Sequence, residues 1–315
     1  MRIVDAAATR AALPFERLVP ALRAMFERGC EVPQRHTHAI ADAEGTAVGT
    51  LLLMPAWQPG AYLGIKTVGI FSGNAGRGLP GLHSTYLLCD ARTGVPLASM
   101  DGNEITSRRT AAASALAASY LAPAAARHLL VVGAGRVARL LPAAYRVVRP
   151  GLERVTVWAR DTAAARALVE DLRGDGFEAR VAGDLAAAVA AADVVSTATL
   201  ATEPLIQGAW LRAASHLDLI GGFNPAMREA DDACFAGDVD RWIDTTEALH
   251  KSGDLLGPMA RGVFAAGDVR GTLADLVRMP AGAPEADRAR RTVFKSVGTA
   301  LEDLAAGRLV FEQSA

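Results

Sequence analysis

Residues Leu129–Ala138 read LLVVGAGRVA, four apolar residues followed by the pattern G-x-G-x-x-A. An apolar run that leads into this glycine pattern is typical of the first strand and turn of a dinucleotide-binding fold. Gly133 allows the tight turn, and Gly135 allows backbone N–H groups to approach a pyrophosphate at the start of a helix. A glycine-rich turn that binds no ligand is the alternative, and the strands that follow the motif disfavour it.

The sequence after this motif alternates between short apolar runs and helical stretches. This alternation is typical of βαβ units, and it predicts an α/β fold with a Rossmann-type doubly wound parallel sheet. The strands of this sheet are expected at residues 128–132, 154–158, 178–182, 193–197, 216–221 and 240–244.

The first part of the chain has a different pattern of apolar and polar residues. An apolar stripe at helical spacing predicts a helix over residues 14–28, with a kink or a late start at Pro20. Alternating segments separated by glycine-containing turns predict a mostly antiparallel sheet of about five strands. These strands are expected at residues 35–41, 47–54, 62–71, 84–90 and 95–101.

Another apolar stripe predicts a helix over residues 290–307 that returns to the first domain. With residues 279–287 as a linker, we expect a discontinuous α+β domain made of residues 1–118 and 288–315. Residues 119–287 are expected to form the Rossmann domain. A chain of 315 residues is also long enough for two domains.

Composition excludes several classes of partner. The chain has 33 Lys and Arg residues against 34 Asp and Glu residues, so its net charge is close to zero. Such a charge provides no electrostatic attraction for nucleic acid or an anionic membrane, and it favours a small molecule as the binding partner. The three cysteines lie far apart, which is typical of reduced thiols, and no segment reads as a signal peptide or a bilayer span. We therefore expect a cytoplasmic protein. No metal site is expected, because His36 and His38 have no third ligand nearby.

The end of the second Rossmann strand indicates the cofactor. NAD-specific folds usually carry an acid there that binds the ribose hydroxyls. Here the sequence is VWARDT, with Ala159 or Arg160 at the expected position. A guanidinium suits a 2′-phosphate, which favours NADP(H) over NAD(H). Asp161 is expected to cap the next helix.

Basic residues outside the nucleotide domain are candidates for anion binding. Lys66 lies in the β segment GIKTV, where a lysine between apolar residues is unusual. A strand-edge lysine that blocks aggregation is the alternative for this residue. Arg35 follows VPQ and is a further candidate.

The alanine-rich segment TSRRTAAASALAASY begins with two arginines that helical geometry separates. Arg109 shares a face with Leu116 and Tyr120, whereas Arg108 shares a face with small residues. The face with the large apolar side chains is expected to point inward, and a buried arginine needs an anion. Arg109 is therefore the better candidate to bind a substrate carboxylate or phosphate. We expect Arg109→Ala to cause a large loss of turnover with folding intact, and Arg108→Ala to be nearly silent.

Motifs spread over nearly the whole chain resemble those of the ornithine cyclodeaminase/mu-crystallin family. They include VPQRHTH (32–38), GIKTVGIF (64–71), VVGAGRVA (131–138), IGGFNPAMREAD (220–231) and FKSVGTALEDLAAG (294–307). The mu-crystallin branch is especially similar around DGNEITSRRTAAASALA (101–117). The resemblance implies that the discontinuous domain binds substrate and forms a homodimer, and that the Rossmann domain binds the dinucleotide.

By motif position, the resemblance implies catalytic and substrate-binding roles for Arg35, Lys66 and Arg109. His83 lies near a segment that contacts the cofactor in the family, so we expect it in the substrate pocket. A strand histidine is more often structural than a proton donor, and proton donation is the alternative role. Nucleotide contacts are implied for a larger set: Gly133, Gly135, Arg136, Val137, Arg160, Thr199 and Ile220.

Two departures from the family pattern bear on the reaction. Ornithine cyclodeaminases carry an aspartate where this chain has Phe223, and a glutamate where it has Leu52. A phenylalanine cannot handle the protons that cyclodeamination requires, and Phe223 is expected to pack against an apolar part of the substrate. The expected function is therefore NAD(P)H-dependent reduction of a small cyclic α-imino acid, as in a pyrroline-2-carboxylate-type ketimine reductase, or amino-acid dehydrogenation. The alternatives are ornithine cyclodeaminase, which Phe223 and Leu52 disfavour, and a non-catalytic NADP-linked ligand-binding protein of mu-crystallin type.

Overall fold

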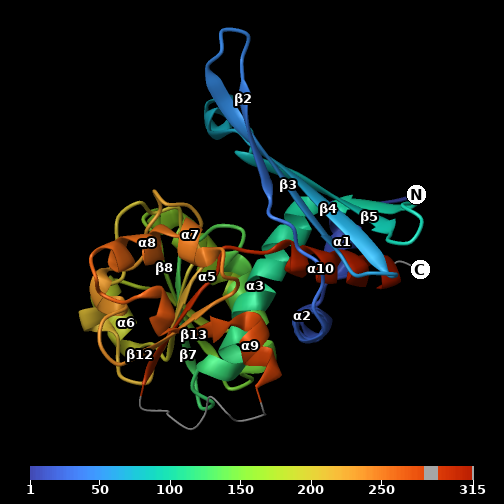
Figure 1. The fold of residues 1–315 in the computed structure, drawn as a ribbon. Coiled ribbons are helices and arrows are strands. Elements are labelled where there is room, and N and C mark those ends of the chain that lie inside the picture. The colour runs from blue at the N-terminus through green and yellow to red at the C-terminus, as the bar shows by residue number, and fades with distance from the viewer. Residues whose placement is uncertain (280–289, 314–315) are drawn as a thin grey trace. The chain divides into compact units, whose positions relative to one another are not determined.

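The structure is a computed structural model that describes residues 1–279 and 290–313. The chain divides into two compact units, Met1–Arg109 with Thr299–Ala315 (unit 1) and Thr110–Gly298 (unit 2). Each unit contains one β-sheet (Figure 1). The sequence placed the boundaries at 118/119 and 287/288. The first of these falls within the helix α3, Gly102–Leu121, and the second precedes the strand β14, Arg291–Lys295.

Unit 1 has a six-stranded sheet with the order β1-β6-β5-β4-β3-β2. The strand β1 pairs in parallel with β6, and the other neighbours are antiparallel. The antiparallel strands confirm the sheet expected from the sequence, whereas the three-residue β1 was not predicted. The strands are β1 (Arg2–Val4), β2 (His36–Ala41), β3 (Ala47–Trp57), β4 (Tyr62–Ile70), β5 (Leu82–Asp90) and β6 (Pro96–Asp101).

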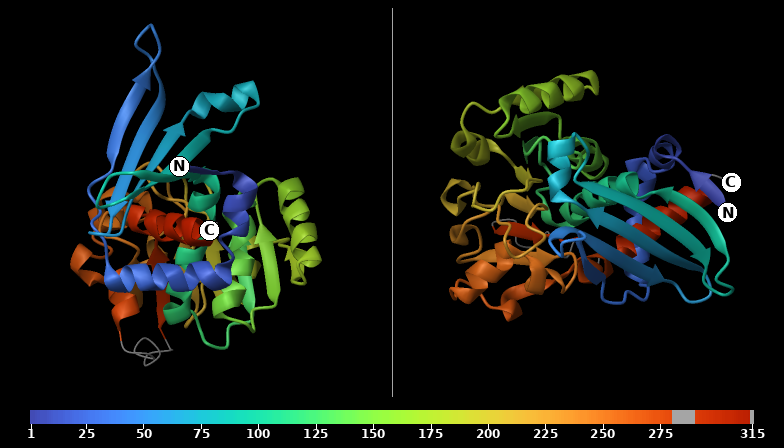
Figure 2. Two further views of the ribbon diagram at one scale, coloured as in Figure 1. Left: turned by 90° about the vertical axis from the view of Figure 1, so that its right-hand side faces the viewer. Right: turned by 90° about the horizontal axis from the view of Figure 1, so that it is seen from above.

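The helices of unit 1 are α1 (Ala6–Ala11), α2 (Phe15–Arg28), α10 (Ala300–Gln313) and the first part of α3, and the 3₁₀ helix η1 spans Ser72–Arg77. The apolar stripe of α2 is buried, as expected, and the helix continues through Pro20. In sequence α10 is almost 300 residues from α2, yet the two helices contact each other, and α10 also packs on β3 and β4 (Figure 2).

Tyr86 of β5 lies at the contact between this sheet and α10. Its side chain is fully buried, and two glycines make room for it. A Cβ atom at Gly64 on β4 or at Gly307 on α10 would overlap the Tyr86 side chain. The close approach of α10 to the sheet therefore depends on glycine at both positions.

Unit 2 has an eight-stranded, fully parallel sheet with the order β13-β12-β14-β11-β10-β7-β8-β9. The strand order reverses direction between β7 and β10, which is the switch point of a doubly wound sheet. This confirms the expected Rossmann-type fold. The strands are β7 (His128–Val132), β8 (Arg154–Trp158), β9 (Glu178–Val181), β10 (Val194–Thr197), β11 (His216–Leu219), β12 (Val239–Ile243), β13 (Val269–Thr272) and β14.

Helices connect most of these strands, and their apolar faces cover the sheet. The α-helices are α4 (Leu141–Val148), α5 (Thr162–Gly174), α6 (Leu185–Ala191), α7 (Ala248–Lys251), α8 (Gly253–Ala260) and α9 (Leu273–Arg278). The 3₁₀ helices are η2 (Ala138–Leu140), η3 (Gly208–Trp210), η4 (Asp232–Cys234) and η5 (Ala266–Asp268). Within the described ranges, no helix is long and apolar enough to cross a membrane.

The helix expected over residues 290–307 is wrong in its first half. Residues Arg291–Lys295 form β14, which lies between β11 and β12, and α10 begins only at Ala300. The run Thr292-Val293-Phe294 is β-branched and aromatic, and its last two side chains are buried in the sheet. The linker expected at residues 279–287 lies outside the described residues except for Met279.

Candidate functional site

The predicted nucleotide-binding turn follows β7 in unit 2. Gly133 has φ 120°, and a Cβ there would lie 2.6 Å from the carbonyl oxygen of Ala198. Only glycine fits this backbone. A Cβ at Gly135 would meet nothing within 4 Å, so the backbone there borders open space. That combination of a tight turn and an open backbone fits a bound pyrophosphate.

The helix after this turn starts later than the motif predicts. Arg136 is exposed and Val137 is half-buried, and both precede the 3₁₀ helix η2. Pro142 occupies the start of α4, where its missing N–H costs no hydrogen bond. Arg136 and Val137 therefore belong to the turn and not to a helix. Their contacts with a nucleotide stay predictions.

Asp161 is the N-cap of α5, as expected. Its carboxylate accepts hydrogen bonds from the backbone N–H groups of Ala163, at 2.9 Å, and Ala164, at 3.2 Å. The acid next to the strand end is therefore engaged in capping. Arg160, which is exposed, is the charged side chain that remains at the end of β8.

A buried glutamate that the sequence did not single out joins the carboxyl ends of two strands. Glu229 is fully buried, and its Oε1 accepts hydrogen bonds from the backbone N and the hydroxyl of Thr199, at 2.8 and 2.7 Å. Its Oε2 accepts from the Thr197 hydroxyl at 2.7 Å and from the Gly221 backbone N at 2.6 Å. Glu229 therefore fixes Thr199 after β10 and Gly221 after β11, next to the predicted cofactor residue Ile220.

The segment that carries Glu229 is itself held by a buried ion pair. Asp254 Oδ1 accepts from the backbone N–H groups of Glu229, at 2.7 Å, and Ala230, at 3.1 Å. Its Oδ2 accepts from Lys295 Nζ at 3.0 Å, and neither side chain is exposed. The strand β14 thus helps to position the loop that follows β11.

Phe223 lies in that loop and is 42% exposed. No carboxylate occupies its position, so the loop has no proton-handling side chain there. Its expected contact with an apolar part of the substrate stays a prediction.

The predicted substrate residues of unit 1 form a buried charge cluster with α10. Lys66 Nζ donates to Asp303 Oδ1 at 2.8 Å and lies 2.7 Å from Oδ2. Arg109 donates from Nε to Asp303 Oδ1 at 3.0 Å and from Nη1 to Glu302 Oε2 at 2.6 Å. Lys66 is 1% exposed and Arg109 6%, so all four groups are removed from bulk water. Within the described part of the chain, the Nη2 end of Arg109 has no hydrogen-bond partner.

Electrostatics bring Arg35 into the same cluster. Burial lowers the pKa of Lys66 to about 8, Asp303 raises it in part, and the positive charges of Arg109 and Arg35 lower it further. Lys66 can therefore change protonation state near neutral pH. The structure places Arg35 and Arg109 close enough to Lys66 to act on its charge, and the catalytic roles of the three residues stay predictions.

Glu302 and Asp303 were missed as partners of these cations. The signal was present, because both acids interrupt the otherwise apolar helix segment GTALEDLAAG. Charged residues in such a position are almost never buried unless they are paired. Their partners could not be read from the sequence.

The expectation for Arg108 is corrected. Its Nε donates to the backbone carbonyl of Leu13 at 2.8 Å, and its guanidinium lies 4.6 Å from the centre of the Phe15 ring. Arg108 is therefore half-buried and holds α3 against the segment that starts α2, so its replacement by alanine is not expected to be silent.

His83 is not brought to this cluster. Lys66 pairs with Tyr86 across β4 and β5, so these two side chains share a face of the sheet. His83 is three residues from Tyr86, and side chains alternate between faces, so its exposed side chain lies on the opposite face.

The His36 and His38 rings stack at 6.4 Å, and no group of three metal-ligating side chains is found in the described ranges. Leu52 is half-buried on β3.

The chain is similar to known proteins over most of its length. The sequence model of the ornithine cyclodeaminase/mu-crystallin family matches residues 7–315. The Delta(1)-pyrroline-2-carboxylate reductase of Paracoccus denitrificans is 44% identical over 279 residues, covering 86% of this chain and 87% of that protein. The ketimine reductase mu-crystallin of Rattus norvegicus is 35% identical over 268 residues, 84% of this chain and 80% of that protein. The solved Thermococcus litoralis Delta(1)-pyrroline-2-carboxylate reductase, in complex with NADH and L-proline, superposes with a TM-score of 0.89 at 28% identity over 100% of this chain and 97% of that one.

Proposed function

Since the chain belongs to the ornithine cyclodeaminase/mu-crystallin family, we propose that it is an NAD(P)H-dependent reductase of a small cyclic α-imino acid, such as Δ1-pyrroline-2-carboxylate. The observation that carries this proposal is the buried charge cluster of unit 1, in which Asp303 holds Lys66 beside Arg109. The similarity to the Paracoccus reductase supports it.

The cluster is matched to a substrate with one carboxylate. Arg35, Lys66 and Arg109 carry three positive charges, and Glu302 and Asp303 carry two negative ones, so the five groups together have a formal charge of +1. The free Nη2 end of Arg109 offers a charge-assisted hydrogen bond to a carboxylate oxygen. Because the cluster is buried, such a bond is stronger than it would be in water.

Lys66 is suited to handle the proton of the reaction. Reduction of a C=N bond adds a hydride to carbon and a proton to nitrogen, and bound NAD(P)H supplies the hydride. A lysine with a pKa of about 8 holds a proton at neutral pH and can give it up. Its ammonium group can therefore donate a hydrogen bond to the imine nitrogen or the carboxylate while Asp303 fixes its position. Phe223 needs no role in proton transfer.

The residues that would hold the dinucleotide lie in unit 2. Gly133 and Gly135 would admit the pyrophosphate, and Arg136 and Val137 border it. Thr199 and Ile220, which Glu229 helps to position, would line the rest of the site. Arg160 would bind the 2′-phosphate, so we infer that NADP(H) is preferred over NAD(H). The test is the ratio of the two Kd values, which Arg160→Gln should shift toward NAD(H).

We further propose a cytoplasmic homodimer formed through unit 1. The β2–β3 hairpin extends beyond the other strands of its sheet, and most residues of β2 are exposed on both faces (Figure 1). A strand with two exposed faces and a free edge is suited to cover by a second copy. The three cysteines are free thiols, which suits a reducing compartment. Sedimentation of the wild type against a variant with β2 side chains replaced by charges tests the dimer.

The activity test is NADPH oxidation with Δ1-pyrroline-2-carboxylate and Δ1-piperideine-2-carboxylate. We expect turnover with at least one of them, and loss of turnover in Lys66→Met. Tight NADPH binding without turnover on either imine, or on α-keto acids with ammonia, would instead support a ligand-binding protein of mu-crystallin type. Conversion of ornithine to proline at a comparable rate would overturn the role given to Phe223.

A further inference from the structure

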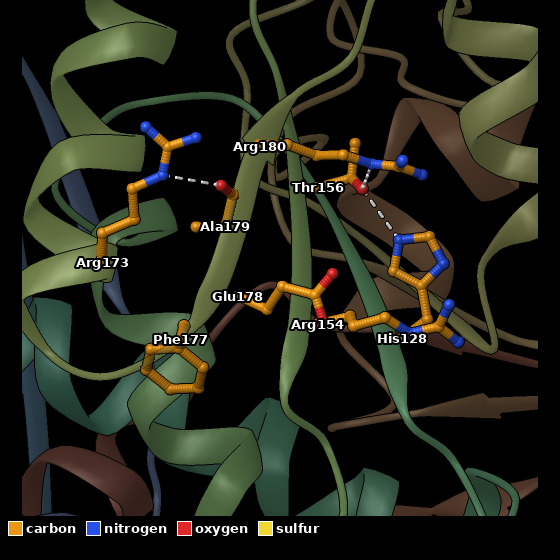
Figure 3. Close-up of a pocket in the computed structure, with 8 residues that line it drawn as sticks. All are labelled: His128, Arg154, Thr156, Arg173, Phe177, Glu178, Ala179 and Arg180. Atoms are coloured by element: carbon orange, nitrogen blue, oxygen red, sulfur yellow. Dashed lines mark hydrogen bonds between the residues drawn. The ribbon is translucent and has the colours of Figure 1, made fainter.

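A polar pocket lies in unit 2, away from the glycine turn. Its volume is 380 Å³, and Figure 3 shows its lining at β7, β8 and β9. Most of its lining comes from the first residues of these strands, whereas the nucleotide-binding turn follows their carboxyl ends. The charged and polar lining residues are His128, Arg154, Thr156, Arg173, Glu178 and Arg180.

The strand register places the central side chains on one face of the sheet. His128 pairs with Arg154, and Thr156 pairs with Arg180. Arg154 and Thr156 are two residues apart on β8 and therefore point to the same side. Arg154 and Arg180 are diagonal neighbours on adjacent strands, which places their Cα atoms roughly 7–8 Å apart. Arginine side chains are long enough to converge from that backbone spacing, so both guanidinium groups can contact one tetrahedral anion.

Hydrogen bonds through two buried side chains orient Arg180, which is itself exposed. His128 Nδ1 lies 3.0 Å from the carbonyl oxygen of Ala191, which can only accept, so the Nδ1 atom carries the proton. His128 Nε2 then accepts from the Thr156 hydroxyl at 2.8 Å, and the Thr156 oxygen accepts from Arg180 Nε at 3.3 Å. His128 and Thr156 are 3% and 2% exposed. These hydrogen bonds hold the Nε atom of Arg180 and leave its two terminal nitrogens directed toward the pocket.

The pocket has an excess of positive charge. Arg154, Arg173 and Arg180 line it against one carboxylate, Glu178. Of these arginines, Arg173 is already paired with Glu170 at 2.6 Å. Among the described residues, neither the Arg154 guanidinium nor the terminal nitrogens of Arg180 have a hydrogen-bond partner. Burial lowers the pKa of His128, and the charges of Arg154 and Arg180 lower it further. An anion between these arginines would offset that repulsion.

We propose that this pocket binds the phosphate group of a small phosphorylated ligand, with Arg180 and Arg154 as its two principal contacts. The planar forks of two arginines match the oxygens of a phosphate dianion. A volume of 380 Å³ also leaves room for a small organic group attached to the phosphate. The site is separate from the nucleotide-binding turn of the same unit.

Isothermal titration of the full chain with inorganic phosphate, pyrophosphate and AMP tests the proposal, and sodium chloride at matched ionic strength gives the background. We expect saturable binding that weakens at least tenfold in Arg180→Gln and in Arg154→Gln. Arg166→Gln, a change of the same charge at an exposed position on α5, should bind like the wild type. The part of the response that is lost in Arg180→Gln belongs to this pocket. If that part is stronger with AMP than with phosphate, the ligand is a phosphate ester, and if it is equal, the ligand is phosphate itself.

A further arm separates this pocket from the nucleotide-binding turn. If Arg160→Gln abolishes phosphate binding while Arg180→Gln leaves it intact, the anion binds at the turn and the proposal is overturned. Absence of saturable binding to the wild type also overturns it. A Thr156→Val variant removes the hydroxyl that links His128 to Arg180 and should bind phosphate more weakly. Its thermal stability, measured in parallel, controls for misfolding. The imidazole NMR signals of His128 should shift with phosphate in the wild type and not in Arg180→Gln.

Discussion

Lys66 Nζ and the carboxylate of Asp303 lie 2.8 Å apart in the interior of unit 1, although 237 positions separate them in sequence. The pair is fully buried, so neither charge is solvated by bulk water. Desolvation favours the neutral amine and Asp303 favours the ammonium, and the balance leaves the pKa of Lys66 at about 8. The proposed reaction therefore depends on a residue that is close to its titration point.

Activity should fall as pH rises through about 8, because Lys66 loses its proton there. Asp303→Asn removes the group that raises the Lys66 pKa, so the alkaline limb of kcat/KM should move to lower pH. Glu312→Gln makes the same charge change at an exposed position on α10 and serves as the control. An unchanged limb in Asp303→Asn would show that Lys66 does not set it.

Arg109→Ala should destabilise unit 1 as well as stop turnover. The change leaves Glu302 and Asp303 buried with less compensating charge, and removal of one partner from a buried ion pair costs about 3–5 kcal/mol. The sequence led us to expect intact folding in this variant, and the structure changes that expectation. Urea denaturation measures the effect, and a midpoint equal to the wild type would contradict it.

Arg108→Ala should lower stability moderately and leave the kinetics of the folded enzyme unchanged. The variant loses one hydrogen bond to Leu13 and the contact with the Phe15 ring, together about 1–2 kcal/mol. Arg108→Lys retains the charge without the planar group and should recover only part of the loss. Differential scanning calorimetry beside steady-state kinetics distinguishes this result from a catalytic effect.

Glu229→Gln should weaken dinucleotide binding. An amide cannot accept at both ends, so one of the groups around Thr199 and Gly221 loses its acceptor. We expect the Kd for NADPH to rise roughly tenfold, equivalent to about 1.4 kcal/mol. Fluorescence titration of NADPH measures this. Wild-type affinity in a destabilised variant would assign Glu229 a structural role alone.

Asp218 should make unit 2 less stable as pH rises from about 4 to 6. Its carboxylate is fully buried and accepts from Ser114 at 3.0 Å and Tyr145 at 2.9 Å, and burial raises its pKa to about 6. The folded state therefore keeps this proton longer than the unfolded state, whose value is near 3.8, so stability is lost as pH rises through that window. The full difference is about 3 kcal/mol.

Asp218→Asn should remove this pH dependence. The variant should therefore gain stability relative to the wild type as pH rises. The difference between their free energies of unfolding, variant minus wild type, should be larger at pH 7 than at pH 4. Parallel curves for the two proteins across this range would show that Asp218 is not the titrating group.

Local features of the sequence predicted local features of the structure. The strand and tight turn at Gly133 and the cap at Asp161 depend on neighbours within a few residues, and both were predicted correctly, although the helix after the turn starts later than expected. The inward face of Arg109 followed from the spacing of apolar residues along one helix. Each of these inferences needed only the geometry of a single element.

Features that depend on distant partners could not be predicted in the same way. The segment with Val293 and Phe294 continued an apolar stripe at helical spacing, and only its neighbours β11 and β12 make it a strand. The ion partners of Arg109 come from α10, and the hydrogen-bond partners of Glu229 come from two different strand ends. Which side chains meet across such sequence distances is decided by the tertiary fold.

The return of α10 to unit 1 has a consequence for biosynthesis. Lys66 and Arg109 leave the ribosome with β4 and α3, while Glu302 and Asp303 arrive only after all of the sheet of unit 2 has been made. Until then, the two cations have no acids to bury against and must stay hydrated, so the sheet of unit 1 cannot close over them. In nascent chains arrested before α10, unit 2 should therefore resist protease while unit 1 is still cleaved. The buried charge cluster is thus among the last parts of the molecule to form.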